Sequence, residues 1–173
     1  MTKARPPIDN ICQALDEMDG TAGIGKILFE SISRLTPAVS VELIIKSQDQ
    51  RSSLLTWRED ELYGPGWHVP GGVVRFKETL TSRVKKVLKN EVAASASKIA
   101  GPIGFHEIFN EKRDKRGHFI CFVYKVTLIE DPPFRTKAQD GVITRGSWRW
   151  FTKCPDNLIE NQHSLVKYID GKF

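Results

Sequence analysis

The chain of 173 residues is about the length of one domain, and it is long enough to bury a sizeable hydrophobic core. Its composition, 40% hydrophobic and 27% charged, is ordinary for a globular protein, and no apolar run is long enough to span a membrane. The first ten residues, MTKARPPIDN, lack the apolar segment of a secretory signal, so we expect a cytoplasmic protein.

The net charge of +5 suits an anionic ligand such as a nucleotide. The basic residues are dispersed, the densest run (111–117) also contains acids, and no nucleic-acid-binding motif is present, so nucleic acid is not the expected partner. The three cysteines, Cys12, Cys121 and Cys154, form no CxxC pair, which predicts free thiols and no zinc site.

Residues 1–37 read as an N-terminal helical extension of two segments, and residues 38–173 as the main domain. Apolar residues recur at helical spacing in both segments of the extension. They are Ile11, Ala14, Leu15 and Met18 in the first segment, and Ile27, Leu28, Ile32 and Leu35 in the second. Pro37 ends the second segment.

The main domain alternates between strand-like and helix-like segments. Strands are expected at 39–47, 52–58, 67–70, 71–76, 102–109, 118–129 and 147–151. The clearest helix covers 78–98, a final amphipathic helix covers 157–169, and residues 132–146 form a long loop. This order predicts an α/β protein of the α+β kind, with a mixed β-sheet sandwiched between helices.

A Gly-Gly turn between a short strand and the central helix carries the clearest motif. The sequence WHVPGG (67–72) precedes it, and Gly72 and Glu78 stand in a G-x5-E spacing. This stretch resembles the signature of the Nudix hydrolases, G-x5-E-x7-R-E-U-x-E-E-x-G-U, in which U is apolar. The resemblance implies a Nudix-like fold and a site for phosphates and Mg²⁺.

The helical half of the signature has lost most of its acidic residues. Lys86 replaces the Arg, Val87 and Asn90 replace two Glu residues, and Glu91 retains the last Glu. Positions 87, 90 and 91 would share a helix face, where three carboxylates would form a hard-oxygen site. The resemblance implies that the main-chain carbonyl of Gly71 also binds the metal. With Glu91 this makes two protein ligands, which predicts a single Mg²⁺ held largely by water and substrate phosphates. The alternative is that Glu91 is a solvated helix residue.

One branch of the family, the GDP-mannose mannosyl hydrolases, has a signature reduced in the same places. The resemblance covers roughly residues 22–152 and includes LLTWR (54–58), GHFICFVYKV (117–126) and WRWF (148–151). It implies that water attacks the anomeric carbon of a nucleotide sugar and releases the nucleoside diphosphate. The N-terminal helix is similar to a dimerising element of these hydrolases, which makes a homodimer an expectation.

The branch also suggests roles for three residues. Arg58 matches an Arg that stabilises the leaving diphosphate, Glu42 an Asp near the substrate, and His118 a His of the site. Each has a plain structural alternative. Arg58 would then be a surface strand residue, Glu42 a satisfied strand carboxylate, and His118 a His at a strand entry.

The sequence departs from this branch before the last strand, where the branch has Gln-His, a metal ligand and the general base. Thr144 and Arg145 stand there instead, and Arg cannot act as a base at neutral pH. Arg145, Arg58 and Lys86 would instead suit a pocket for anionic phosphates. The remaining candidates for the base are Gln139, Asp140, His106, His163 and Glu42.

These residues favour a Mg²⁺-dependent hydrolase of a GDP-mannose-like nucleoside diphosphate sugar. Two alternatives stay open: a non-catalytic nucleotide-binding module, and a nucleotide pyrophosphohydrolase that attacks phosphorus. Trp57 and Tyr63 are candidates to stack on a nucleotide base, whereas Trp67 is expected in the core.

Overall fold

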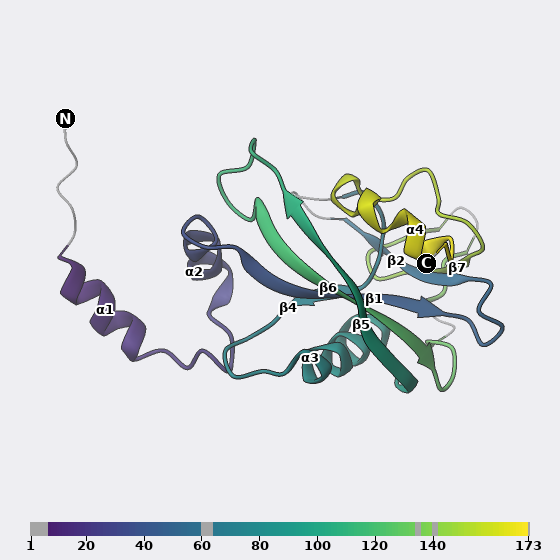
Figure 1. Ribbon diagram of the computed structural model, residues 1–173, viewed down its shortest axis with the longest axis horizontal. Coiled ribbons are helices and arrows are strands. Elements are labelled where there is room, and N and C mark those ends of the chain that lie inside the picture. Colours follow the sequence, from purple (N-terminus) through teal and green to yellow (C-terminus); the bar gives the residue numbers. More distant parts are fainter. Residues whose placement is uncertain (1–6, 60–63, 134–135, 140–141, 173) are drawn as a thin grey trace.

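A mixed β-sheet is the centre of the molecule. The computed structural model describes residues 7–59, 64–133, 136–139 and 142–172, and within these ranges seven strands form one sheet. The strands are β1 (Ala38–Lys46), β2 (Ser53–Arg58), β3 (Gly66–His68), β4 (Gly71–Val73), β5 (Ala96–Phe109), β6 (His118–Leu128) and β7 (Trp148–Phe151). The order is β3-β2-β1-β6-β5, with β4 paired to β1 and β7 paired to β2 (Figure 1). Strands β1 and β6 are parallel, and the other pairs are antiparallel.

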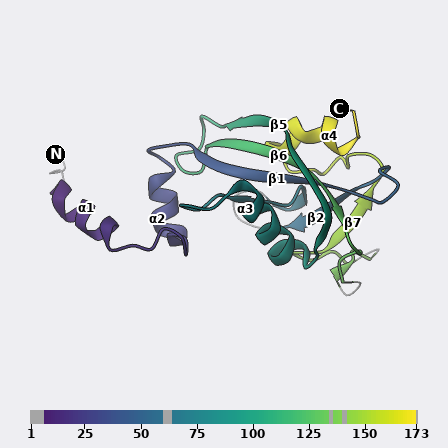
Figure 2. The ribbon, with the colours of Figure 1, turned by 60° about the horizontal axis from the view of Figure 1, so that its bottom comes forward.

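Strand β1 contributes to two hydrophobic cores, one on each face of the sheet. Val41, Leu43 and Ile45 pack with the helix α3 (Leu80–Val87), whereas Ile44 packs with the C-terminal segment. This alternation follows from the two-residue period of a strand. Helices α3 and α4 (Val166–Ile169) accordingly lie on opposite sides of β1 and β6 (Figure 2). The expected α+β fold, a mixed sheet between helices, is confirmed.

The central helix is shorter than the sequence predicts. After α3 the chain makes a π-helical turn, η1 (Leu88–Val92), and Ala93 then adopts a left-handed conformation with φ 54°. The prediction of helix up to residue 98 is therefore wrong. Residues from Ala96 onward join β5 and pair with β6, and this pairing outweighs the helix preference of the alanines.

The predicted single helix over 157–169 is also wrong. A 3₁₀ helix, η3 (Glu160–Leu165), leads directly into the short α4. Leu158 forms a backbone bridge with Trp67, which holds the start of this segment against the sheet edge. The end is held by the buried Lys46, whose Nζ donates to Ser53 Oγ and to the Ile169 carbonyl, both at 2.9 Å.

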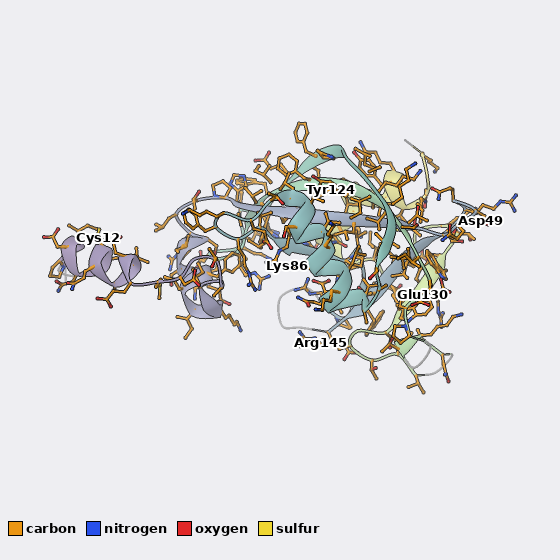
Figure 3. The ribbon with its side chains drawn as sticks, turned by 90° about the horizontal axis from the view of Figure 1, so that it is seen from below. Cys12, Asp49, Lys86, Tyr124, Glu130 and Arg145 are labelled. Atoms are coloured by element: carbon orange, nitrogen blue, oxygen red, sulfur yellow. The ribbon has the colours of Figure 1, made fainter. Side chains whose placement is uncertain are left out.

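The two N-terminal helices relate differently to the sheet. Helix α1 (Ile8–Asp16) projects from the body, with Cys12 far from the sheet, and buries no residue (Figure 3). Helix α2 (Gly25–Ile32) and the residue after it contact the turn between β5 and β6. There Lys115 Nζ lies 3.4 Å from Glu30 Oε2, and the Arg116 N–H donates to Ser33 Oγ at 2.9 Å.

No helix in the described part of the chain is long and apolar enough to cross a membrane.

Candidate active site

A polar cavity of about 600 Å³ opens beside the Gly-Gly turn. Strands β1 to β4, the turn η1, the β5–β6 turn and the C-terminal segment all contribute to its lining. Its charged and polar lining residues include Glu42, Arg58, His68, Asn90, Glu91, Arg116, Arg145, Asn161 and Gln162, and Gly71 and Gly72 supply backbone.

Glu42 on β1 is the buried carboxylate of this cavity. Gln162 Nε2 donates to Glu42 Oε2 at 2.9 Å and to the Val69 carbonyl at 3.0 Å, and its Oε1 accepts the Val69 N–H at 2.7 Å. Burial first, and then the nearby Glu91 carboxylate, raise the pKa of Glu42 well above its usual range, while Arg58 and Gln162 oppose that shift. Gly71 packs directly on Glu42, since a Cβ there would lie 2.5 Å from Glu42 Oε2.

Glu91 on η1 and His68 on β3 face each other across the cavity. His68 Nε2 lies 3.9 Å from Glu91 Oε2, and the side chains are 12% and 37% exposed, respectively. His68 Nδ1 donates to the Thr56 carbonyl at 2.9 Å, and Thr56 Oγ1 is 3.4 Å from both ring nitrogens. The carboxylate is therefore accessible, and the imidazole ring is held against the neighbouring strand.

Arginines from three separate segments reach the cavity. Arg58 ends β2, Arg116 lies in the β5–β6 turn, and Arg145 lies in the loop before β7. That loop is fixed to β2, because the Gly146 N–H donates to the Trp57 carbonyl at 2.9 Å. Three guanidinium groups around one cavity attract an anionic ligand such as a diphosphate.

The oxygen donors of the cavity fit a divalent cation. Glu91 and Glu42 lie close enough for the charge of one to raise the pKa of the other, and a cation between them would offset that repulsion. Among the described residues, no group of three or more His, Cys, Asp or Glu side chains is arranged to hold a metal. A cation here would thus depend on main-chain oxygen, water and ligand phosphates.

Comparison with known proteins places the chain in a family. No family model matches it. Over 107 residues the chain is 34% identical to the low-salt glycan biosynthesis protein Agl8 of Haloferax volcanii, which covers 60% of this chain and 67% of that protein. The fold is similar to that of a MutT Nudix hydrolase from Burkholderia pseudomallei, with a TM-score of 0.60, 17% identity, and coverage of 78% of this chain and 98% of that one. The chain belongs to the family of Agl8, and its fold is that of the Nudix hydrolases.

A second Nudix structure resembles the chain and contains a ligand. The Nudix domain of Shewanella oneidensis NrtR, in complex with ADP ribose, has a TM-score of 0.50 and 19% identity, and the match covers 81% of each chain.

The structure brings together five residues selected from the sequence, four by the Nudix resemblance and Arg145 because its charge suits a phosphate. Glu42, Arg58, Gly71, Glu91 and Arg145 all line the cavity, although they come from four strands or turns and one long loop. The nucleotide-facing candidate Trp57 also lines it.

Two selected residues lie outside the cavity lining. Lys86 on α3, labelled in Figure 3, places Nζ 2.8 Å from Glu78 Oε1. His118 at the start of β6 places Nε2 2.7 Å from Glu107 Oε1 on β5. Each side chain has an acidic partner of its own.

Glu78, the first Glu of the Nudix signature, organises the turn that follows the cavity. It accepts the Arg75 N–H at 3.0 Å and lies 3.5 Å from Arg83 Nε, in addition to its contact with Lys86. Although burial acts to raise its pKa, the Lys86 hydrogen bond and these other contacts leave the pKa of Glu78 lowered.

The helical half of the Nudix signature is arranged differently from a regular helix face. Asn90 and Glu91 line the cavity, whereas Val87 is buried in the hydrophobic core. The π-helical turn changes the angular spacing between these positions.

The other candidates for the Nudix base lie elsewhere. His106, His163 and Gln139 are not part of the lining. Asp140, and the candidate stacking residue Tyr63, lie outside the described residues. Trp67 is 3% exposed in the core, as expected.

Among the lining residues that sequence reasoning missed are His68, Arg116 and Gln162. His68 could have been found from strand alternation, because Trp67 and Val69 on either side of it are buried in one core and the residue between them must face the other way. Arg116 lies in a turn that reads as solvated, and Gln162 lies in a segment that reads as an amphipathic helix. No local signal marks either of these two.

Proposed function

We propose that this protein is a hydrolase of a GDP-mannose-like nucleoside diphosphate sugar that uses one Mg²⁺ ion. One observation carries the proposal: Glu91 and Gly71 line the same cavity as Arg58, Arg116 and Arg145. A carboxylate and a main-chain carbonyl suit a cation, and the arginines suit the diphosphate bound to it. The glycan biosynthesis named for Agl8 supports a sugar-containing substrate, and the ADP ribose bound to NrtR supports a nucleoside diphosphate compound.

The reaction follows from these positions. The water oxygen forms a bond to the anomeric carbon, the bond between that carbon and the diphosphate oxygen breaks, and the nucleoside diphosphate leaves with the electron pair. Glu91 and the Gly71 carbonyl would hold a cation, and that cation would neutralise the charge on the leaving diphosphate. Arg58, Arg116 and Arg145 bind and stabilise the same group. Glu42, fixed by Gln162, is our candidate for accepting the proton of the water.

The test is turnover of a nucleotide sugar panel, including GDP-mannose and GDP-glucose, with Mg²⁺. We expect free sugar and nucleoside diphosphate as products. Glu91→Gln should lower kcat by about a hundredfold or more, the usual loss on removing a group that stabilises developing charge. Glu130→Gln is the matched control, since Glu130 is exposed just beyond β6 and outside the cavity, and its activity should equal that of the wild type.

The products also test the alternatives. A sugar phosphate with a nucleoside monophosphate would indicate attack at phosphorus and overturn attack at carbon. Nucleotide binding without turnover across the panel would favour a non-catalytic binding module.

A further inference from the structure

His68 and Glu91 form a pair that the Nudix signature does not include. Their side-chain atoms are 3.9 Å apart, which is too long for a direct hydrogen bond between imidazole and carboxylate. Two donors that share one small divalent cation, each at about 2.1 Å from it, are separated by at most about 4.2 Å. The separation in the structure thus lies within the range that a shared cation allows.

The orientation of the imidazole supports the same conclusion. Nδ1 donates to the Thr56 carbonyl at 2.9 Å, which leaves Nε2 of the neutral ring with its lone pair on the side of Glu91. Histidines that bind metals usually donate their other N–H to a carbonyl or carboxylate, because that bond fixes the ring and its tautomer. Thr56 Oγ1, at 3.4 Å, is too distant from Nε2 to be a strong competing donor.

The backbone makes this arrangement rigid on both sides. His68 pairs with Thr56 in the β2–β3 register, so the acceptor carbonyl belongs to the sheet. Glu91 is carried by the π-helical turn η1, and Leu88 and Val92 of that turn are buried in the core. The imidazole side chain is largely buried while Glu91 is partly exposed, which leaves an open path for an ion and its ligand.

We propose that His68 Nε2 is a protein ligand of the divalent cation at Glu91, and that the site, while able to use Mg²⁺, therefore binds Mn²⁺ or a similar transition metal more tightly. Imidazole nitrogen binds transition metals well, whereas Mg²⁺ prefers oxygen donors. This proposal rests on the proposed function because it concerns the same cation, and it replaces the all-oxygen ligand set with a mixed one.

The test measures cation binding to the full-length protein and needs no turnover. Mn²⁺ is added with and without GDP, and pulsed electron paramagnetic resonance detects ¹⁴N coupling to the bound ion. We expect a histidine nitrogen signal, which shifts when only the histidines carry ¹⁵N. His68→Gln should remove the signal and weaken Mn²⁺ binding tenfold or more, with a smaller loss for Mg²⁺.

His163→Gln is the matched control. His163 lies outside the cavity lining and its Nε2 donates to the Leu158 carbonyl at 3.2 Å, so this variant should keep both the signal and the affinity. A wild-type protein with no bound Mn²⁺, or with bound Mn²⁺ and no nitrogen coupling, would overturn the proposal, and so would a signal retained in His68→Gln. Turnover with Mg²⁺ but no nitrogen coupling would support the proposed function and overturn the role of His68. Nitrogen coupling without turnover would support the role of His68 and overturn the proposed function.

Discussion

Single residues of the cavity depend on close contacts with the backbone. Gly71 is the clearest case, since an added Cβ would lie 2.5 Å from Glu42 Oε2 and 2.8 Å from the Val41 carbonyl. Only glycine fits between β1 and the cavity at this point. The position of Glu42 therefore depends on the absence of a side chain at Gly71.

Gly71→Ala should displace Glu42. We expect a loss of about 1–3 kcal/mol in the free energy of unfolding, the usual cost of overpacking, together with weaker cation binding. Urea unfolding and Mn²⁺ titration measure the two effects.

Gly25→Ala is the control for this substitution. Gly25 has φ +69° and a Cβ there would have no atom within 4 Å, so only the backbone cost of about 1 kcal/mol applies. Cation binding should not change in this variant. Unchanged cation binding in Gly71→Ala would contradict the contact that we infer between Gly71 and Glu42.

The helix that carries Glu91 is defined by its two ends. Thr79 caps the start of α3, because its Oγ1 accepts the Ser82 N–H at 3.1 Å. The other end is the π-helical turn, which Ala93 terminates in the left-handed conformation. The π-helical turn carries Glu91 to the cavity lining, and such turns are rare and often occur at functional sites.

Thr79→Ala should destabilise the protein by about 1 kcal/mol, the typical loss of an N-cap side chain. Thr81→Ala is its control, since Thr81 is exposed inside the same helix and alanine is the better helix former. We expect no loss of stability in the control. Equal unfolding midpoints in urea for the two variants would show that the cap does not stabilise α3.

At the scale of the whole molecule, helix α1 is the element with least contact to the rest. Ile11 and Leu15 of α1, Met18 just after it, and Leu28 of α2 line a shallow apolar groove. Within the described residues, α1 buries none of its own side chains. We propose that a second copy of the chain covers this groove, as the expected homodimer requires.

Light scattering of the full-length protein should then give twice 19.6 kDa, about 39 kDa. Removal of residues 1–19 should reduce the measured mass to that of a single truncated chain. At low protein concentration the same truncation should leave the midpoint of thermal unfolding nearly unchanged. A full-length protein with the mass of one chain would refute the homodimer.

The sequence by itself determined the parts of this protein that local periodicity encodes. The strand β1, the order of strands and helices, and the position of the Gly-Gly turn all follow from residues close together in the chain. Glu42, Arg58, Gly71 and Glu91 were selected by resemblance and Arg145 by its charge, and the structure places all five around one cavity.

Only the tertiary structure decided where the helices end and what completes the cavity. Ala96 and the residues after it form a strand because β6 is available to pair with them, and that partner is about thirty residues away in the chain. Arg116 and Gln162 reach the cavity for the same kind of reason, since turn packing and side-chain contacts bring distant segments together. Such long-range contacts leave no periodic signal near the residues that they position.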